Sequence, residues 1–276
     1  MVLYAPERSI LRVAGEDAGA FLDALVTNEV SRATADAPVY AGLLSPQGKV
    51  IADFIAFLAA DGALLLDIAA ARADAVRQKL VLYRLRRRIG IEDVSDRLHA
   101  LVRTDAQPGW VADPRRPDGS LGYRQLAEAP PRETAPIAGY EALRIAAGVP
   151  DLAADAEPEE AFALEALFEE FNGVDFQKGC FIGQENVSRM KRRATTRRKF
   201  CRVACEGAPP PFGAEIIAGA ASIGTVRSGV DGCALAFLRL DRALEAGERN
   251  QDLMAGGVVL RLDPPAWLIM PATGDD

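Results

Sequence analysis

Two apolar segments joined across one glycine constrain the fold of this chain more than any other feature. VIADFIAFLA (residues 50–59) has the composition of a long strand, and ALLLDIA (63–69) follows it after Gly62. Apolar runs joined by a short glycine turn are typical of a β-hairpin. Residues 71–83 then place apolar side chains at helical spacing. Hairpins with helices between them predict an α+β fold rather than a doubly wound parallel sheet.

The pattern of the sequence changes near residue 197. Beyond that point, short strand-like runs such as KFCRVAC and SIGTVRSG are separated by Gly, Pro and Asp residues. This pattern is typical of a small β-barrel, and 276 residues suffice for a large and a small domain. We therefore expect one domain at residues 1–196 and a C-terminal β-barrel domain at residues 197–276. Residues 107–137, rich in Pro, Gly and charged side chains, predict a long surface excursion.

The cysteine and histidine content excludes several kinds of active site. The four cysteines, Cys180, Cys201, Cys205 and Cys233, form no CxxC pair, and His99 is the only histidine. A structural zinc site needs four regularly spaced ligands, and a Ser-His-Asp triad needs a histidine base. We therefore expect no stably bound metal and no histidine-based catalysis, and we interpret His99 as structural.

Charge and hydropathy narrow the class of protein further. The net charge of −7 argues against a protein that coats nucleic acid with its whole surface. The apolar runs are too short for a membrane-spanning helix, so we expect no membrane partner. The first ten residues, MVLYAPERSI, lack the patterns of a secretory signal and of a transit peptide. The expectation from this segment is a cytoplasmic location.

One cysteine stands in a distinctive sequence, VDFQKGCFIGQENVSRMK (residues 174–191). The pattern predicts a strand, a tight glycine loop and a helix that begins near Gly183, where helix N–H groups attract anions. Gly179 permits a close backbone approach. Lys178 and the helix end would both favour the thiolate form of Cys180 and lower its pKa. The alternative is a buried cysteine that acts as a small apolar residue.

A run of basic residues follows directly. Residues 189–199 (RMKRRATTRRK) hold seven basic side chains in eleven, and YRLRRR (83–88) forms a second cluster. The first run predicts a patch for a polyanion such as RNA phosphate or a polyglutamate tail. A solvated helix face explains it equally well. If the chain binds tRNA, we expect the contacts to come from Arg192, Arg193, Arg197 and Arg198.

The segment NGVDFQKGCFIGQENVSR resembles the signature of the YgfZ-type folate-binding proteins, relatives of the aminomethyltransferase (T protein) of the glycine cleavage system. The family pattern is KGCYxGQE followed by an arginine, with Phe181 here in place of the usual tyrosine. The segments LLSPQGKVIADFIAF and FALEALFEEFNGV are similar to further parts of the family, so the resemblance spans essentially the whole chain. The matching residues of the signature are Lys178, Gly179, Cys180, Gly183, Gln184, Glu185 and Arg189.

This resemblance implies an aminomethyltransferase-like ring of subdomains, with antiparallel sheets and helices around a central channel and a small C-terminal β-barrel. It implies tetrahydrofolate or a derivative as cofactor. The implied role is that of an accessory factor in the assembly or repair of iron–sulfur clusters, mainly of the [4Fe–4S] type. The implied partners are iron–sulfur assembly proteins or client cluster enzymes, with an indirect link to tRNA modification. We expect a monomer.

Two departures from the aminomethyltransferases bear on enzymatic activity. Those enzymes carry two adjacent aspartates where this chain has Ala52 and Asp53, and a glutamate where it has Ala146. The differences favour a maturation factor over glycine-cleavage chemistry. A folate-dependent aminomethyl- or methyltransferase is the alternative, and a tRNA-binding protein is the third hypothesis.

The resemblance also implies roles for single residues. Cys180 is the expected reactive group, as a transient iron ligand, a partner in a mixed disulfide or a nucleophile toward a folate-borne unit. Asp53 is the second catalytic candidate. Glu165 is the first candidate for the amide-like edge of the pterin ring, because a carboxylate accepts two hydrogen bonds there. The other expected cofactor-binding residues are Asn28, Lys178, Gly179, Gln184, Glu185 and Arg189.

Overall fold

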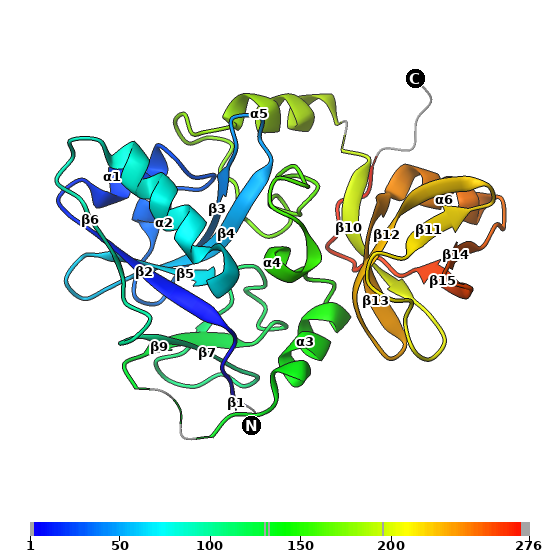
Figure 1. Cartoon of the computed structure of the whole chain (residues 1–276), viewed down its shortest axis with the longest axis horizontal. Coiled ribbons are helices and arrows are strands. Elements are labelled where there is room, and N and C mark those ends of the chain that lie inside the picture. Colours follow the sequence, from blue (N-terminus) through cyan, green and yellow to red (C-terminus); the bar gives the residue numbers. More distant parts are fainter. Residues whose placement is uncertain (1–2, 130, 132, 195, 272–276) are drawn as a thin grey trace.

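The computed structural model describes residues 3–129, 131, 133–194 and 196–271. They form two antiparallel sheets, a closed barrel and six α-helices (Figure 1). Thr195 of the basic run and residues 272–276 of the expected barrel domain lie outside the described part. Among the described residues, no helix has both the length and the apolar stretch that a membrane crossing requires.

The larger sheet contains the hairpin that the sequence predicts. Its strand order is β3-β4-β5-β2-β6. Phe54 pairs with Ile68 across the hairpin, and Gly62 has φ +83°, which a glycine adopts without strain. The predicted hairpin is therefore confirmed. The strands are β2 (Arg8–Ala14), β3 (Val39–Leu44), β4 (Val50–Leu58), β5 (Leu64–Ala69) and β6 (Gly90–Asp93).

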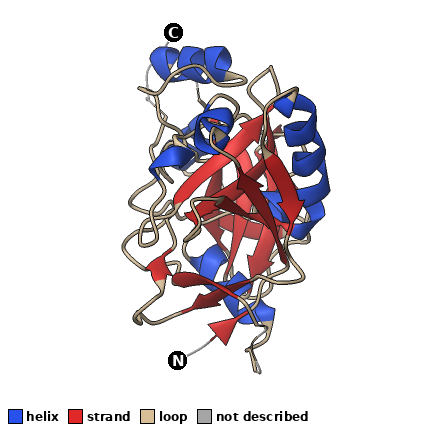
Figure 2. Cartoon of the chain, turned by 90° about the vertical axis from the view of Figure 1, so that its left-hand side faces the viewer, coloured by secondary structure: helices blue, strands red, loops and turns tan. Residues whose placement is uncertain are grey.

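Two helices and a short 3-10 helix accompany this sheet. Helix α2 (Ala70–Arg84) follows β5 directly and packs along the sheet (Figures 1 and 2), burying Val76 and Leu80 in its core. Helix α1 (Ala18–Asp23) follows β2 and buries Phe21 and Leu22. The 3-10 helix η1 (Val30–Arg32) comes before β3.

The smaller sheet overturns one prediction. Its order is β1-β7-β9-β8, and residues 107–137, predicted to be a surface excursion, supply two of its strands. The same segment buries Asp113, Arg115 and Arg124. Opposite charges that pair with one another can be buried, which composition alone does not reveal. The strands are β1 (Leu3–Tyr4), β7 (His99–Arg103), β8 (Val111–Ala112) and β9 (Tyr123–Ala127), and helices α3 (Ile137–Ala146) and α4 (Leu152–Asp155) follow them.

The C-terminal strands close into a six-stranded barrel of order β10-β13-β12-β11-β14-β15. Phe200 of β10 and Phe237 of β13 face each other on these neighbouring strands and stack, with ring centroids 4.6 Å apart. The predicted fold class, α+β with antiparallel sheets and a small C-terminal barrel, is confirmed. Helix α6 (Leu240–Glu248) within the barrel segment was not predicted. The strands are β10 (Arg198–Ala204), β11 (Glu215–Ala218), β12 (Ala221–Val230), β13 (Cys233–Arg239), β14 (Leu253–Ala255) and β15 (Val258–Leu262).

One hydrophobic core joins the larger sheet to the barrel. It includes Ile55 of β4, Phe168 and Phe171 of the turn-rich segment 161–174, and Phe237 of β13. Helix α5 (Gln184–Arg193) follows this segment and leads into β10 (Figure 1). The cysteine-bearing loop between them is therefore fixed at both ends by packed structure.

Candidate functional site

The predicted helix after the cysteine loop is confirmed, and Gly183 marks its start. Gly183 is the N-cap of α5 with φ +81°. A Cβ atom there would lie 2.7 Å from Ser45 O and 2.9 Å from Gly48 Cα. Only glycine permits this approach to the turn between β3 and β4. The loop is thus locked against the larger sheet at its C-terminal end.

The expected strand before the loop is absent, because a side chain bonds the backbone instead. Asp175 Oδ1 accepts hydrogen bonds from the backbone N–H of Gln177 (2.7 Å) and Lys178 (3.2 Å). An aspartate that bonds its own following backbone forms a turn. No strand is assigned to residues 174–176.

Lys178 ties the loop to the segment around α1. Its Nζ donates to the carbonyl oxygens of Asp23 (2.6 Å), Val26 (2.6 Å) and Asn28 (2.9 Å). Burial lowers the pKa of Lys178 to about 8, against the attraction of Asp23 and Asp175, which raise it. The ammonium group expected to stabilise a thiolate is therefore bonded to three backbone carbonyls.

Cys180 stands exposed in this anchored loop. Gly179 beside it is also exposed, with no atom near the position of a Cβ, whereas Phe181 is buried. The reading of Cys180 as a buried apolar residue is therefore wrong. Burial instead describes Cys201, whose pKa it raises to about 12. In the described part of the chain, no three His, Cys, Asp or Glu residues are grouped to hold a metal ion.

The first two turns of α5 supply the other residues of the loop motif. Gln184 is the first helical residue, and Glu185 is exposed in the first turn. Arg189 Nη2 donates to Asn186 Oδ1 at 2.5 Å, and Asn186 Nδ2 donates to Gln47 O at 2.6 Å. Arg189 thus supports the contact between α5 and the β3–β4 turn.

The basic run beyond α5 is only partly paired. Lys191 pairs with Glu169, and Lys199 is buried against Glu170 at 2.5 Å. The four arginines expected to contact tRNA form no ion pair with any described carboxylate. Arg198 places its guanidinium 3.9 Å from the centre of the Phe237 ring. Of these four arginines, Arg192, Arg193 and Arg197 are exposed.

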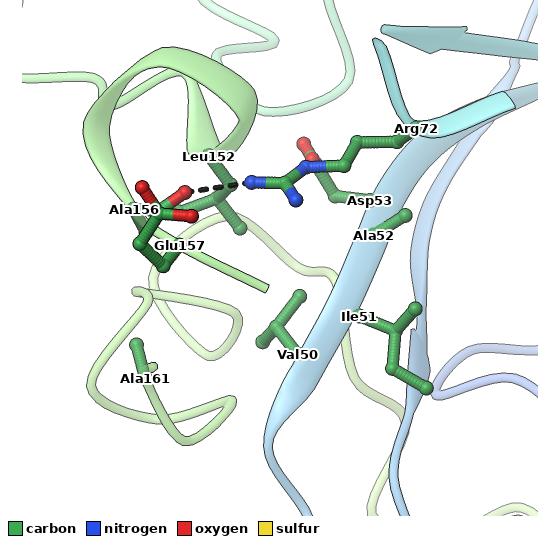
Figure 3. A pocket seen from close by; sticks show the side chains of 9 residues that line it. All are labelled: Val50, Ile51, Ala52, Asp53, Arg72, Leu152, Ala156, Glu157 and Ala161. Carbon is green, nitrogen blue, oxygen red and sulfur yellow. Dashed lines mark hydrogen bonds between the residues drawn. The ribbon is translucent and has the colours of Figure 1, made fainter. Parts of the chain in front are cut away.

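Asp53 is buried in β4, away from open solvent. Tyr40 donates its hydroxyl to Asp53 Oδ2 at 3.0 Å. Burial raises the pKa of Asp53, with a further rise from Asp151, while Arg8 and Arg115 oppose the shift. Figure 3 shows Asp53 beside Arg72 on the wall of a small cavity. That cavity holds about 10 Å³, room for about one water molecule.

A larger cavity, here called the arginine cavity, lies between β2, β9, α3 and α4. Its volume is about 440 Å³, within the range of small-molecule sites, roughly 300–1,000 Å³. Neither Cys180 nor Glu165 lines it. Its charged and hydroxyl-bearing lining residues are Glu7, Arg8, Arg115, Arg124, Tyr140, Glu141, Arg144 and Asp151.

Buried ion pairs hold the walls of the arginine cavity. Arg124 donates to Asp113 (2.5 Å), to Asp67 (3.0 Å) and to the Tyr140 hydroxyl (2.8 Å). Arg115 forms a second bond to Asp113, at 2.8 Å. Burial favours the neutral acid, but the two guanidinium groups outweigh it and lower the pKa of Asp113. Such paired charges are stable in a low-dielectric interior, whereas an isolated one is not.

This network was not predicted from the sequence. One available signal was Asp67, which interrupts the apolar run LLLDIA as Asp53 interrupts its neighbour strand. Both carboxylates prove to be buried. The arginines gave no signal, because they lie in the segment predicted to be a surface excursion.

Two further predicted residues lie apart from the arginine cavity. Asn28 donates through Nδ2 to the carbonyls of Tyr40 (2.9 Å) and Asn172 (2.6 Å), so it supports the base of the cysteine loop. Glu165 Oε2 accepts from Phe162 N at 2.9 Å, and burial raises the pKa of Glu165. The Glu165 carbonyl accepts from Phe200 N of β10 at 3.2 Å, which places this residue at the junction with the barrel.

Comparisons with known proteins place the chain beside iron–sulfur assembly factors. Residues 197–269 match the family model described as the CAF17 C-terminal beta-barrel domain. The mitochondrial iron-sulfur cluster assembly factor IBA57 of Homo sapiens is 29% identical, over 91% of this chain and 82% of its own length. The IBA57 homolog of Mycosarcoma maydis is 32% identical over 75% of this chain. The chain spans little more than half of that relative, 58% of its length.

A solved structure shows the fold. The crystal structure of glycine cleavage system aminomethyltransferase T from Bartonella henselae superimposes with a TM-score of 0.74. It covers 98% of this chain and 86% of its own, at 14% sequence identity. The resemblance to the T-protein fold is thus confirmed, and this neighbour says nothing further about activity.

The comparisons correct one expectation. The cytoplasmic location predicted from the first ten residues is contradicted, because the similar IBA57 proteins are named mitochondrial. The prediction rested on the absence of a targeting pattern in one short segment, and that absence does not determine where a chain acts.

Proposed function

We propose that this chain is a tetrahydrofolate-binding accessory factor for iron–sulfur cluster assembly or repair, with Cys180 as its reactive group. The similarity to the IBA57 assembly factors carries the proposal. The exposed cysteine supports it, since a maturation factor must present its thiol to another protein.

The surroundings of Cys180 favour a role toward a partner protein. Thiolate is a preferred ligand of iron in iron–sulfur chemistry. One thiol cannot hold a cluster alone, so the remaining ligands come from the partner. Cys180 does not line the arginine cavity, which speaks against attack on a folate bound there. A transient iron contact and a mixed disulfide both fit an exposed thiol in an anchored loop.

The arginine cavity suits a folate by size and by charge. Arg8, Arg115 and Arg144 on its walls bring positive charge to the carboxylates of a glutamate tail. Each of them also pairs with a carboxylate of the chain, Asp67, Asp113 and Asp155 in turn. Burial acts to raise the pKa of Asp151, but Arg8 and Arg144 outweigh it and lower that pKa. An ionised Asp151 accepts hydrogen bonds from the amino group and ring N–H of a pterin. Bound tetrahydrofolate would supply a carrier of one-carbon units.

Within this proposal Asp151 replaces Glu165 as the residue that pairs with the pterin edge. Glu165 lies outside the cavity lining, whereas Asp151 is part of it. Calorimetry with tetrahydrofolate tests the assignment. We expect Asp151→Asn to weaken binding at least tenfold and Glu165→Gln to leave it unchanged. Equal binding by Asp151→Asn, or no binding by the wild-type protein, contradicts the folate site.

The transferase alternative rests on Asp53. A buried carboxylate with a raised pKa, bonded to a tyrosine hydroxyl, suits proton transfer. Incubation of the purified protein with tetrahydrofolate and a methylamine donor decides between the two functions. Turnover that is lost in Asp53→Asn supports a transferase, and absence of turnover in a folate-binding preparation supports the accessory factor.

Complementation tests the role of Cys180. In a strain that lacks the protein, we expect Cys180→Ala and Cys180→Ser to leave [4Fe–4S] enzymes inactive. Cys205→Ala is the matched control, because Cys205 is partly exposed on the barrel, away from the loop. Full recovery of enzyme activity by Cys180→Ala would remove the cysteine from the mechanism.

A further inference from the structure

The turn that ends α2 holds a leucine where its backbone favours glycine. Arg87 N donates to Arg84 O at 3.0 Å, which closes a four-residue turn. Leu85, the first central residue, has φ 53° and ψ −117°. These angles match the first central position of a type II′ turn, about +60° and −120°, which glycine dominates. A bulky residue with positive φ is strained there.

Packing does not account for this leucine. Leu85 is 82% exposed, and Leu82 and Val81 on the preceding helical turn are 69% and 41% exposed. The core-facing side of α2 is complete without them, since Ala73, Val76 and Leu80 are buried there. Leu85 therefore carries both backbone strain and an exposed apolar side chain. No packing within the folded chain compensates for either.

Three arginines adjoin these apolar side chains. Arg86, Arg87 and Arg88 are exposed, and none pairs with a carboxylate among the described residues. Consecutive unpaired arginines stand out on a chain of net charge −7. We call Val81, Leu82, Leu85 and Arg86–Arg88 the α2 surface.

We propose that the α2 surface docks an acidic, amphipathic segment of a partner protein. Apolar side chains on the segment would cover Leu82 and Leu85, and its carboxylates would pair with the three arginines. Protein interfaces favour an apolar centre with arginine beside it. Burial of the apolar side chains would also offset the strain that the turn carries in the free protein.

Other occupants fit the surface less well. Exposed leucines make few favourable contacts with a nucleic acid. The α2 surface also contains no aromatic side chain that could stack on a base. Membrane-surface helices carry a long apolar face, whereas the apolar face of α2 is already buried in the sheet core. The charge on Arg86–Arg88 combined with a small apolar patch therefore favours a protein.

The α2 surface and the cysteine loop both contact α1. The Arg87 guanidinium is 5.7 Å from the centre of the Phe21 ring in α1. Lys178 of the loop bonds the carbonyl of Asp23 at the end of the same helix. In Figure 1 the C-terminal end of α2 points toward α1. A partner docked on the α2 surface would therefore touch the element that also anchors the cysteine loop, although the docking itself does not depend on the chemistry of the Cys180 thiol.

Site-specific photocrosslinking of the full chain in its own cells tests the docking. A benzophenone amino acid replaces Leu82 in one variant and Phe212 in the control, which is exposed on the barrel segment. We expect adducts at position 82 to one protein, through a segment that combines carboxylates with apolar residues, and no such adduct at position 212. Adducts only to lipid, nucleic acid or a second copy of this chain, or no adduct, would overturn the proposal.

Binding of a synthetic peptide with the sequence of the crosslinked segment completes the test. Leu85→Gly should raise the melting temperature, because it relieves the turn, and weaken peptide binding at least tenfold. Replacing Arg86, Arg87 and Arg88 by alanine should weaken it at least tenfold and flatten its salt dependence. Arg97→Ala, an exposed arginine on another loop, is the control. Wild-type affinity in both α2 variants contradicts the proposal, and Cys180→Ala should bind the peptide normally.

Discussion

The cysteine loop and the arginine cavity differ in what they expose and what they bury. The loop presents one exposed thiol, and its neighbours are held by hydrogen bonds to backbone groups, chiefly those of Lys178 and Asp175. The cavity wall buries charged side chains that hold one another, chiefly Asp113 with Arg115 and Arg124. An exposed atom on an anchored loop suits contact with another protein, and a charged cavity of about 440 Å³ suits a small ligand.

The two regions also differ in how many contacts carry them. One ammonium group anchors the cysteine loop to α1, whereas several ion pairs together stabilise the structure around Asp113. Replacing single side chains in each region and measuring the free energy of unfolding therefore tests this difference between the loop and the cavity wall. The expected effects on the free energy of unfolding run from several kcal/mol to nearly zero.

The largest effect is expected at Asp113. Asp113→Ala leaves Arg115 and Arg124 without their shared carboxylate inside the protein, and we expect a loss of about 3–5 kcal/mol in unfolding free energy. Denaturant titration measures it. Asp96→Ala, at an exposed ion pair with Arg97, should cost less than about 0.5 kcal/mol. Similar values for both variants would show that the buried network does not support the cavity wall.

A smaller loss is expected at Lys178. Lys178→Met removes charged donors from three carbonyls, and we expect a loss of about 2–3 kcal/mol. Hydrogen exchange should also rise at residues 175–183 more than elsewhere. Lys79→Met on α2, where no described residue bonds the side chain, is the matched control. If exchange in the loop stays slow in Lys178→Met, then Gly183 and Asp175 suffice to hold it.

Asp53→Asn should act in the opposite direction. Because burial raises the pKa of Asp53, the folded state bears a cost for its charge at neutral pH. The amide removes that cost, and we expect a gain in the free energy of unfolding at pH 7. The wild-type protein recovers the same amount as pH falls through the raised pKa toward about 4, so the gain should fade there. Denaturant unfolding at several pH values checks this, and a gain that grows with acidity would contradict it.

The smallest effect on stability is expected at the residue with the largest proposed role. Cys180→Ser changes an exposed side chain, and we expect a shift within about 0.5 kcal/mol. Thermal unfolding measures it alongside complementation. Cys201→Ser, in the buried strand β10, should cost about 1–3 kcal/mol because it buries a hydroxyl. A strongly destabilised Cys180→Ser would mean that the thiol packs rather than reacts.

Local patterns predicted much of the cysteine loop but little of the cavity. The glycine at position 183 and the helix after it were predicted, because turn geometry and helix starts depend on a few adjacent residues. The bonding of Lys178 was not predicted, since its carbonyl partners lie about 150 positions earlier in the chain. The charged segment around Asp113 looked solvent-exposed, because composition does not show which charges will meet their opposites.

The sequence by itself determined the periods and turns of this protein: the hairpin across Gly62, helix α2 and the strand-rich C-terminal segment that closes as a barrel. Each depends on contacts between near neighbours in the chain. The tertiary structure decided which polar groups are buried. It placed Asp113 and Asp67 on either side of Arg124, bonded Lys178 to the end of α1, and left Cys180 exposed. Those outcomes depend on partners far apart in sequence, whose attraction is strong only after folding has removed the water between them.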